Sequence, residues 1–206
     1  MRRKHVIGLT GNIATGKTTV VEMLVALGAE AIDGDRIVHE LMGPGSPLTD
    51  DIRARFGDET INPDGSINRP ALGAIVFSDP AKLRELEALT WPPVLKRKRE
   101  AIYEPGPDVL VLDAIKLFES GMAEDCDEVW VVTAPRERQI ERIMARNKVD
   151  RTEAERRIDA QPPQEEKVAR ADVVIDNGGS LEATRQQILA AWQRLTSGDA
   201  EAASGM

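Results

Sequence analysis

A glycine-rich stretch near the start of the chain has residue types and a spacing that suit phosphate chemistry. Residues 11–18 read Gly-Asn-Ile-Ala-Thr-Gly-Lys-Thr and match G-x-x-x-x-G-K-[ST], the P-loop pattern. In such a loop backbone N–H groups surround an anion, and the following helix adds the positive end of its dipole. We therefore expect an exposed Lys17 to meet the β- and γ-phosphates of a nucleotide and the Thr18 hydroxyl to bind Mg²⁺.

The flanking residues favour this interpretation over a plain glycine-rich turn. An apolar run, 6–10, precedes the loop and predicts a strand, and residues 17–27 predict a helix that stops at Gly28. The dinucleotide pattern G-x-G-x-x-G is not met, because Ile13 stands at its second glycine.

Three aspartates follow predicted strands. Asp33 ends the second predicted strand, Asp35 follows two residues later, and Asp113 closes the third. The carboxyl ends of parallel strands share one edge of a sheet, so we expect these acids near the P-loop. Phosphoryl transfer needs a group that orients or deprotonates the nucleophile and a ligand for Mg²⁺, and carboxylates suit both. The alternative for each is a turn or helix-capping aspartate.

Arginines form a second group of candidates. Arg142 and Arg146 lie at i, i+4 on one predicted helix face, and Arg156 and Arg157 lie in the charged segment that follows. Arginines on a mobile segment can neutralise the charge of a transition state. The alternative is an exposed helix stabilised by Glu/Arg pairs.

The surrounding pattern alternates short apolar runs with amphipathic stretches, which predicts an α/β fold with parallel strands joined by right-handed crossovers. We expect no core residues in the highly charged segment 147–170, which predicts a surface helix or a lid, and we expect a frayed tail at 197–206. The predicted strands are 6–10, 30–33, 109–114, 128–133 and 172–176, and the predicted helices are 17–27, 81–103, 136–146 and 181–195.

The composition narrows the class of protein. A net charge of −8 without a basic cluster argues against a nucleic-acid-binding surface. The single cysteine, Cys126, excludes an internal disulfide and fits a reducing compartment. With no apolar run long enough for a signal peptide or a membrane span, we expect a cytoplasmic protein that contacts no membrane, as a monomer or weak oligomer.

One motif suggests a different nucleotide. Residues 147–150 read N-K-x-D, the guanine-reading motif of GTPases. It follows a predicted helix instead of a strand, and the D-x-x-G stretch at 176–179 comes after it instead of before it. We therefore interpret both as coincidental.

Taken together, the motifs resemble one family, the dephospho-CoA kinases. The resemblance runs in order through GLTGNIATGKTTV, IDGDRIVHEL, GSINRPALGAIVF, VLDAIKLFESG, RQIERIMAR, RRIDAQ and ARADVVIDNGG. It implies a P-loop kinase fold with a five-stranded parallel core sheet, an inserted helical acceptor-binding segment and a lid. It also implies that ATP, with Mg²⁺, phosphorylates the ribose 3′-hydroxyl of dephospho-CoA to give CoA and ADP.

The resemblance also implies roles for individual residues. Asp35 would be the catalytic base with Asp33 beside it, and Lys17 and Arg142 would act on the phosphates. Mg²⁺ would bind Thr18, with Asp33 or Asp113 contributing through water. The ATP-binding residues would be Gly11, Asn12, Ile13, Ala14, Thr15, Gly16, Lys17, Thr18, Thr19, Arg142, Arg146, Asn177 and Gly178. The acceptor-binding residues would be Thr10, Asp35, His39, Arg69, Leu117, Phe118 and Glu119.

Some positions depart from the family pattern. Asn12, Ala14 and Thr15 replace two glycines and a serine of the usual loop, and Trp91 replaces a histidine before a proline. Lys116 stands three residues beyond Asp113, where it would be either a surface lysine or a contact of the substrate phosphates.

The expected organisation is a single kinase domain. Its core would comprise residues 5–41, 104–146 and 171–196, with an acceptor-binding insertion at 42–103 and a lid at 147–170. Two alternatives stay open: a kinase of another small-molecule alcohol, such as a nucleoside or sugar, and a non-catalytic nucleotide-binding module. The acidic pair Asp33 and Asp35 favours an enzyme, because binding alone needs no base.

Overall fold

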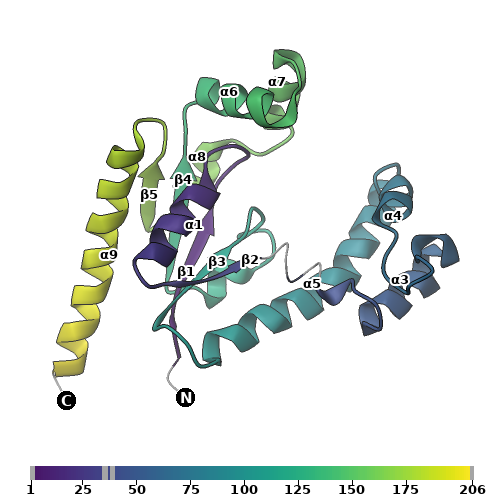
Figure 1. Ribbon diagram of the computed structural model, residues 1–206, viewed down its shortest axis with the longest axis horizontal. Helices are drawn as coiled ribbons and strands as arrows, with labels where there is room; N and C mark the ends of the chain where they lie inside the picture. Colours follow the sequence, from purple (N-terminus) through teal and green to yellow (C-terminus); the bar gives the residue numbers. More distant parts are fainter. Residues whose placement is uncertain (1–2, 34–36, 38–39, 205–206) are drawn as a thin grey trace. The chain divides into compact units, whose positions relative to one another are not determined.

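A five-stranded sheet lies at the centre of the fold (Figure 1). The computed structural model describes residues 3–33, 37 and 40–204, without the side chains of residues 33 and 198–204. The strands are β1 (His5–Thr10), β2 (Glu30–Asp33), β3 (Val109–Asp113), β4 (Glu128–Thr133) and β5 (Val173–Asp176), in the order β2-β3-β1-β4-β5. The pairs β1–β3, β1–β4 and β4–β5 are parallel, which confirms the predicted α/β class.

The central strands are buried on both faces, as expected for a parallel sheet covered on both sides. One face packs on α1 (Lys17–Ala26) and α9 (Leu181–Ser204), through a core that includes Leu24, Trp130 and Ile188. On the other face, a Cβ on Gly8 would lie 2.8 Å from the Leu117 side chain and 2.7 Å from the sulfur of Cys126. The loop that follows β3 therefore covers that side.

The remaining helices of this part follow β3 and β4. The 3₁₀ helix η2 (Met122–Asp125) precedes β4, and α6 (Arg136–Asn147), α7 (Arg151–Asp159) and α8 (Gln164–Val168) connect β4 to β5. Residues 3–31 and 105–206 form one compact unit with the P-loop. None of the helices that the structure describes is both long and apolar enough to cross a membrane.

Residues 32–104 form a second compact unit with its own core. It contains α3 (Pro47–Phe56), the 3₁₀ helix η1 (Asp58–Thr60), α4 (Arg69–Val76) and α5 (Pro80–Tyr103). Ser46, Asn68 and Asp79 cap the three α-helices, each accepting a hydrogen bond from a backbone N–H of the first turn. The core consists of Leu48, Ile52, Phe56, Ile67, Leu72 and Val76.

The structure differs from two predictions about the C-terminal part, the exposure of the charged segment and the end of the last helix. The charged segment 147–170 is not free of core residues, because Ala154 and Ile158 are buried with Ile140 and Ile143 of α6. Two apolar side chains at i, i+4 suffice to dock a short helix on its neighbour. The last helix, α9, continues to Ser204, past the predicted end of that helix at Leu195.

Candidate active site

The P-loop connects β1 to α1 and contains two residues with left-handed backbone angles. Gly16, the N-cap of α1, has φ 93° and ψ 32°, and Ala14 has φ 59°. A left-handed conformation costs a residue with a Cβ about 1–2 kcal/mol, so Ala14 stores strain that a glycine would not. The substitution of Asn12 for the family glycine adds no such strain, because Asn12 is not among the residues with positive φ.

Arg142 of α6 and Asn177, the residue after β5, hold the loop in this shape. The Arg142 guanidinium donates to the carbonyls of Ala14 (3.1 Å), Thr15 (3.0 Å) and Asn177 (2.8 Å). The Asn177 amide donates to the Thr15 carbonyl at 2.8 Å and accepts from the Thr184 hydroxyl at 3.0 Å. Asn177 is buried, so both residues support the loop through its carbonyls and leave its N–H groups to an anion.

Gly16→Ala is expected to destabilise the protein by roughly 2–4 kcal/mol. A Cβ at position 16 would lie 2.0 Å from the Asn177 amide nitrogen, so the substitution adds the loss of a buried hydrogen bond to the strain of a left-handed alanine. Thermal unfolding measures this change.

Gly28→Ala is the matched control for this prediction. Gly28 has a similar φ of 106°, but no atom lies within 4 Å of the position that its Cβ would take. The Gly28→Ala variant should therefore be destabilised only by the strain of a left-handed alanine, which lowers the free energy of unfolding by about 1–2 kcal/mol. Equal melting temperatures for the two variants would show that the contact between Gly16 and Asn177 does not matter.

Lys17, the first residue of α1, is less exposed than predicted. Its side chain is 13% exposed, and its Nζ lies 3.7 Å from a carboxylate oxygen of Asp113 at the end of β3. The predicted proximity of the third-strand aspartate to the P-loop is confirmed, because β3 pairs with β1 and Leu9 lies opposite Asp113. The ion pair holds the ammonium group beside the loop.

A buried lysine that the sequence analysis missed lies near this pair. Lys167 of α8 is 5% exposed and donates to the Ile115 carbonyl at 2.9 Å. The same carbonyl accepts from the Thr10 hydroxyl, at the end of β1, at 3.1 Å. Burial lowers the pKa of Lys167, nearby Glu119 opposes that shift, and Lys17 adds to it. In the sequence nothing distinguishes Lys167 from its charged neighbours.

The segment between α7 and α8 is tied directly to the P-loop. Gln161 accepts from the backbone N–H of Ile13 at 2.7 Å, and the Asn12 amide donates to the Pro162 carbonyl at 2.9 Å. A cavity of about 670 Å³ opens beside these contacts. Its lining includes Asn12 of the P-loop together with Gln139 and Gln161, but not Lys17 or Arg142, so the cavity borders one end of the loop.

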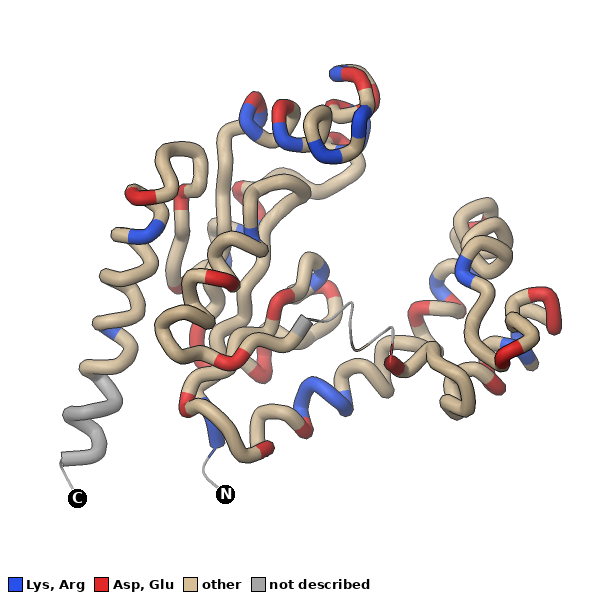
Figure 2. Tube along the Cα trace, viewed as in Figure 1, with Lys and Arg blue, Asp and Glu red and all other residues tan. Residues whose placement is uncertain are grey.

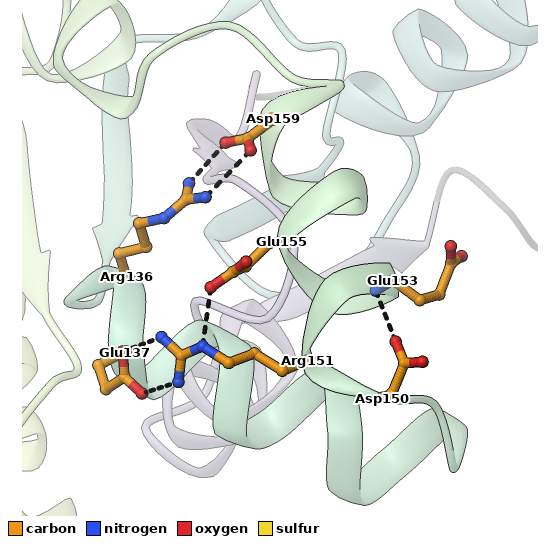
Figure 3. Close-up of polar contacts among 7 residues, drawn as sticks. All are labelled: Arg136, Glu137, Asp150, Arg151, Glu153, Glu155 and Asp159. Atoms are coloured by element: carbon orange, nitrogen blue, oxygen red, sulfur yellow. Dashed lines mark hydrogen bonds and ion pairs between the residues drawn. The ribbon is translucent and has the colours of Figure 1, made fainter.

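Helix α6 and helix α7, the second of which lies in the predicted lid, are rich in charges of both signs (Figure 2). Arg136 forms a bidentate pair with Asp159, and Arg151 binds both Glu137 and Glu155 (Figure 3). Hydrogen bonds from Arg156 and Arg157 lower the pKa of Glu153 to about 2, so the Glu153 carboxylate is charged at neutral pH. These two arginines are therefore engaged by a carboxylate within α7 and do not reach the P-loop in this structure.

The N-K-x-D stretch is a junction between these two helices. Lys148 has φ 56° and caps the C-terminus of α6, and the Asp150 carboxylate accepts from the Glu153 backbone N–H at the start of α7 (Figure 3). The motif therefore has a local structural explanation, as expected for a coincidental match.

The remaining ATP-side candidates are placed as follows. Thr18 is exposed and Thr19 partly exposed at the start of α1. Arg146 is exposed and donates to the Asn147 side chain at 3.1 Å. The Gly178 N–H donates to the Asp176 carboxylate at 2.8 Å.

The acceptor-side candidates fall into three groups. Leu117 is fully buried under the sheet, Phe118 lies under the Arg170 guanidinium at 3.9 Å, and Glu119 is exposed. Arg69 is exposed at the first turn of α4, in the other unit. Asp35, His39 and the side chain of Asp33 lie outside the described residues.

The described residues contain no group of three or more His, Cys, Asp or Glu side chains that could hold a metal ion by themselves.

Comparisons with known proteins agree with this geometry. The family model for dephospho-CoA kinase matches residues 5–183. A dephospho-CoA kinase from Carboxydothermus hydrogenoformans is 49% identical over 92% of this chain and 93% of its own length, and one from Symbiobacterium thermophilum is 47% identical over 95% and 83%. The solved dephospho-CoA kinase from Campylobacter jejuni is 29% identical, covers 95% of this chain and 99% of its own, and superposes with a TM-score of 0.71. The chain belongs to the dephospho-CoA kinase family.

Proposed function

We propose that the protein transfers the γ-phosphoryl group of ATP to the ribose 3′-hydroxyl of dephospho-CoA, giving CoA and ADP, the last step of coenzyme A synthesis. The observation that carries the proposal is the family match over residues 5–183, which includes a P-loop whose lysine lies beside Asp113. Phosphoryl transfer demands positioning and charge neutralisation, and this arrangement supplies both.

On the ATP side, residues 11–19 form the phosphate-binding loop, in which backbone N–H groups that are not engaged elsewhere, unlike the Ile13 N–H bound to Gln161, hold the phosphates, and Lys17 neutralises the β- and γ-phosphates. Arg142 and Asn177 keep the loop open by binding the carbonyls of residues 14 and 15. Arg146 adds positive charge from the end of α6, and Gly178 borders the adenine.

Mg²⁺ fits the donors present at this site. The exposed Thr18 hydroxyl at the start of α1 is one oxygen ligand, and Asp113 or Asp33 supplies a carboxylate, directly or through water. The bound ion neutralises phosphate charge as it develops.

On the acceptor side, Asp35 accepts the proton of the attacking hydroxyl, with Asp33 beside it. Thr10, His39, Arg69, Phe118 and Glu119 line the acceptor site. Leu117 supports that wall from beneath, because its side chain is buried.

A coupled ADP-release assay with a panel of acceptors tests the proposal. Dephospho-CoA should support turnover, whereas nucleosides, sugar alcohols and CoA itself, which lacks a free 3′-hydroxyl, should not. Product mass and ³¹P NMR should locate the new phosphate on the 3′-oxygen. Turnover with another alcohol and none with dephospho-CoA would identify a different small-molecule kinase. ATP binding without turnover on any acceptor would identify a non-catalytic module.

A further inference from the structure

Lys167 is a buried cation without a buried counter-ion. Its side chain is 5% exposed, and its hydrogen bond is to the neutral carbonyl of Ile115. Among the residues that the structure describes, no carboxylate forms an ion pair with it, and the nearby acid that affects it electrostatically, Glu119, is itself exposed. A lysine carries three N–H donors, so one carbonyl leaves most of its donor capacity unused, and the exposed Glu119 only partly offsets its charge.

Such an arrangement is unfavourable for folding alone. Taking an ammonium group out of water is expensive unless an anion lies nearby, and burial accordingly lowers the pKa of Lys167. The second charge close enough to shift this pKa is Lys17, which repels it. Two neighbouring lysines, both largely shielded from water, are well suited to a polyanion that binds between or beside them.

The contacts of Lys167 place it at the phosphoryl-transfer end of the sheet. Ile115, whose carbonyl it binds, lies two residues beyond Asp113, the partner of Lys17. The same carbonyl accepts from Thr10, the residue that precedes the P-loop. Lys167 therefore reaches the carboxyl edge of β1 and β3 from α8, which lies within the predicted lid segment 147–170.

We propose that Lys167 is a second positive charge of the phosphoryl-transfer site, which acts together with Lys17 on the negative charge of the group in transfer. The proposal rests on the proposed kinase function. In this role Lys167 strengthens the stabilisation of the transition state more than the binding of ground-state ATP, because charge on the transferred group and its neighbouring oxygens is redistributed during transfer.

The alternative role for Lys167 is to anchor the Ile115 carbonyl. An anchor needs a side chain that is long enough to bring a hydrogen-bond donor to the carbonyl, whereas an electrostatic role needs the positive charge. Lys167→Arg keeps the charge and a donor, and Lys167→Met keeps the length and apolar stem but removes both. Arg194→Met is the matched control, since Arg194 is exposed on α9 and its substitution changes the net charge equally.

We expect Lys167→Met to lower kcat roughly 10- to 100-fold while the KM for ATP changes less than threefold. This is below the 10²–10³ typical of a direct oxyanion donor, because Lys167 acts over a longer distance. Lys167→Arg should retain most of kcat, and Arg194→Met should match the wild type. Affinity for ADP with aluminium fluoride and dephospho-CoA should fall with kcat in Lys167→Met, while affinity for ADP alone should not. Melting temperatures confirm that each variant is folded at the assay temperature.

Two results would overturn the proposal. One is a folded Lys167→Met variant whose kcat lies within about twofold of the wild type. The other is an equal loss of kcat and of melting temperature in Lys167→Met and Lys167→Arg, which would make Lys167 a structural anchor. A wild-type protein that is inactive on dephospho-CoA would refute the proposed function instead, and the same comparison would then be made on the acceptor that it does phosphorylate or on its hydrolysis of ATP.

Discussion

Lys17→Ala is expected to lower kcat by about 10²–10³-fold, or more, in a protein that still folds. Lys17 provides the P-loop cation at the β- and γ-phosphates, and removing a single donor to developing charge typically has an effect of this size. The side chain is partly shielded and lies 3.7 Å from Asp113, so its loss also leaves a carboxylate without its cation beside the phosphates. Both effects act on the transition state.

Stability should change little by comparison. The ammonium and the carboxylate are 3.7 Å apart, beyond hydrogen-bond distance, so losing Lys17 from this largely shielded pair should lower the free energy of unfolding by about 1–3 kcal/mol and the melting temperature by several degrees. ADP release and thermal unfolding, measured on the same preparation, separate the two quantities. Arg194→Ala, with the same loss of charge on an exposed helix position, is the matched control. Wild-type turnover by a folded Lys17→Ala protein would refute the P-loop assignment.

The sequence predicted the elements that position this site because their signals are local. An apolar run, a glycine-rich turn and a helical pattern follow one another in residues 5–26, and each has a strong conformational preference. The five strands appeared within one residue of their predicted ends for the same reason. Asp113 lies next to the P-loop because β3 pairs with β1. The alternation of strands and helices in the sequence is compatible with this parallel pairing.

The supporting contacts could not be predicted from the sequence, because they join residues far apart in the chain through backbone atoms. Arg142 and Asn177 were recognised as candidates, but the structure has them bind P-loop carbonyls, which carry no sequence signal. Lys167 looks like any other residue of a charged helix until its burial is known. Leu117 was expected in the acceptor wall, yet it faces the core beneath the sheet, where Gly8 leaves room for it.

A different substitution tests the chemical step itself. Asp35→Asn is expected to lower kcat by about 10²–10⁴-fold while leaving the affinity for ATP nearly unchanged. General base catalysis by a positioned carboxylate contributes an effect of this size, and asparagine keeps the shape but accepts no proton. The residue follows β2, an edge strand of the sheet beside β3, and the carboxyl ends of parallel strands gather ligands.

Asp33→Asn and Asp113→Asn provide the matched comparison, since each removes one negative charge from the end of a strand. If Asp113 holds Mg²⁺, directly or through water, its variant should need a higher Mg²⁺ concentration for half-maximal activity, whereas Asp35→Asn should show a reduced kcat at every Mg²⁺ concentration. Initial rates over a matrix of ATP, dephospho-CoA and Mg²⁺ concentrations separate these behaviours.

A kcat for Asp35→Asn within a few-fold of the wild type would remove Asp35 from the role of base. A 10²-fold or greater loss in Asp33→Asn at saturating Mg²⁺ would then assign that role to Asp33, because a lost metal ligand alone is overcome by added metal.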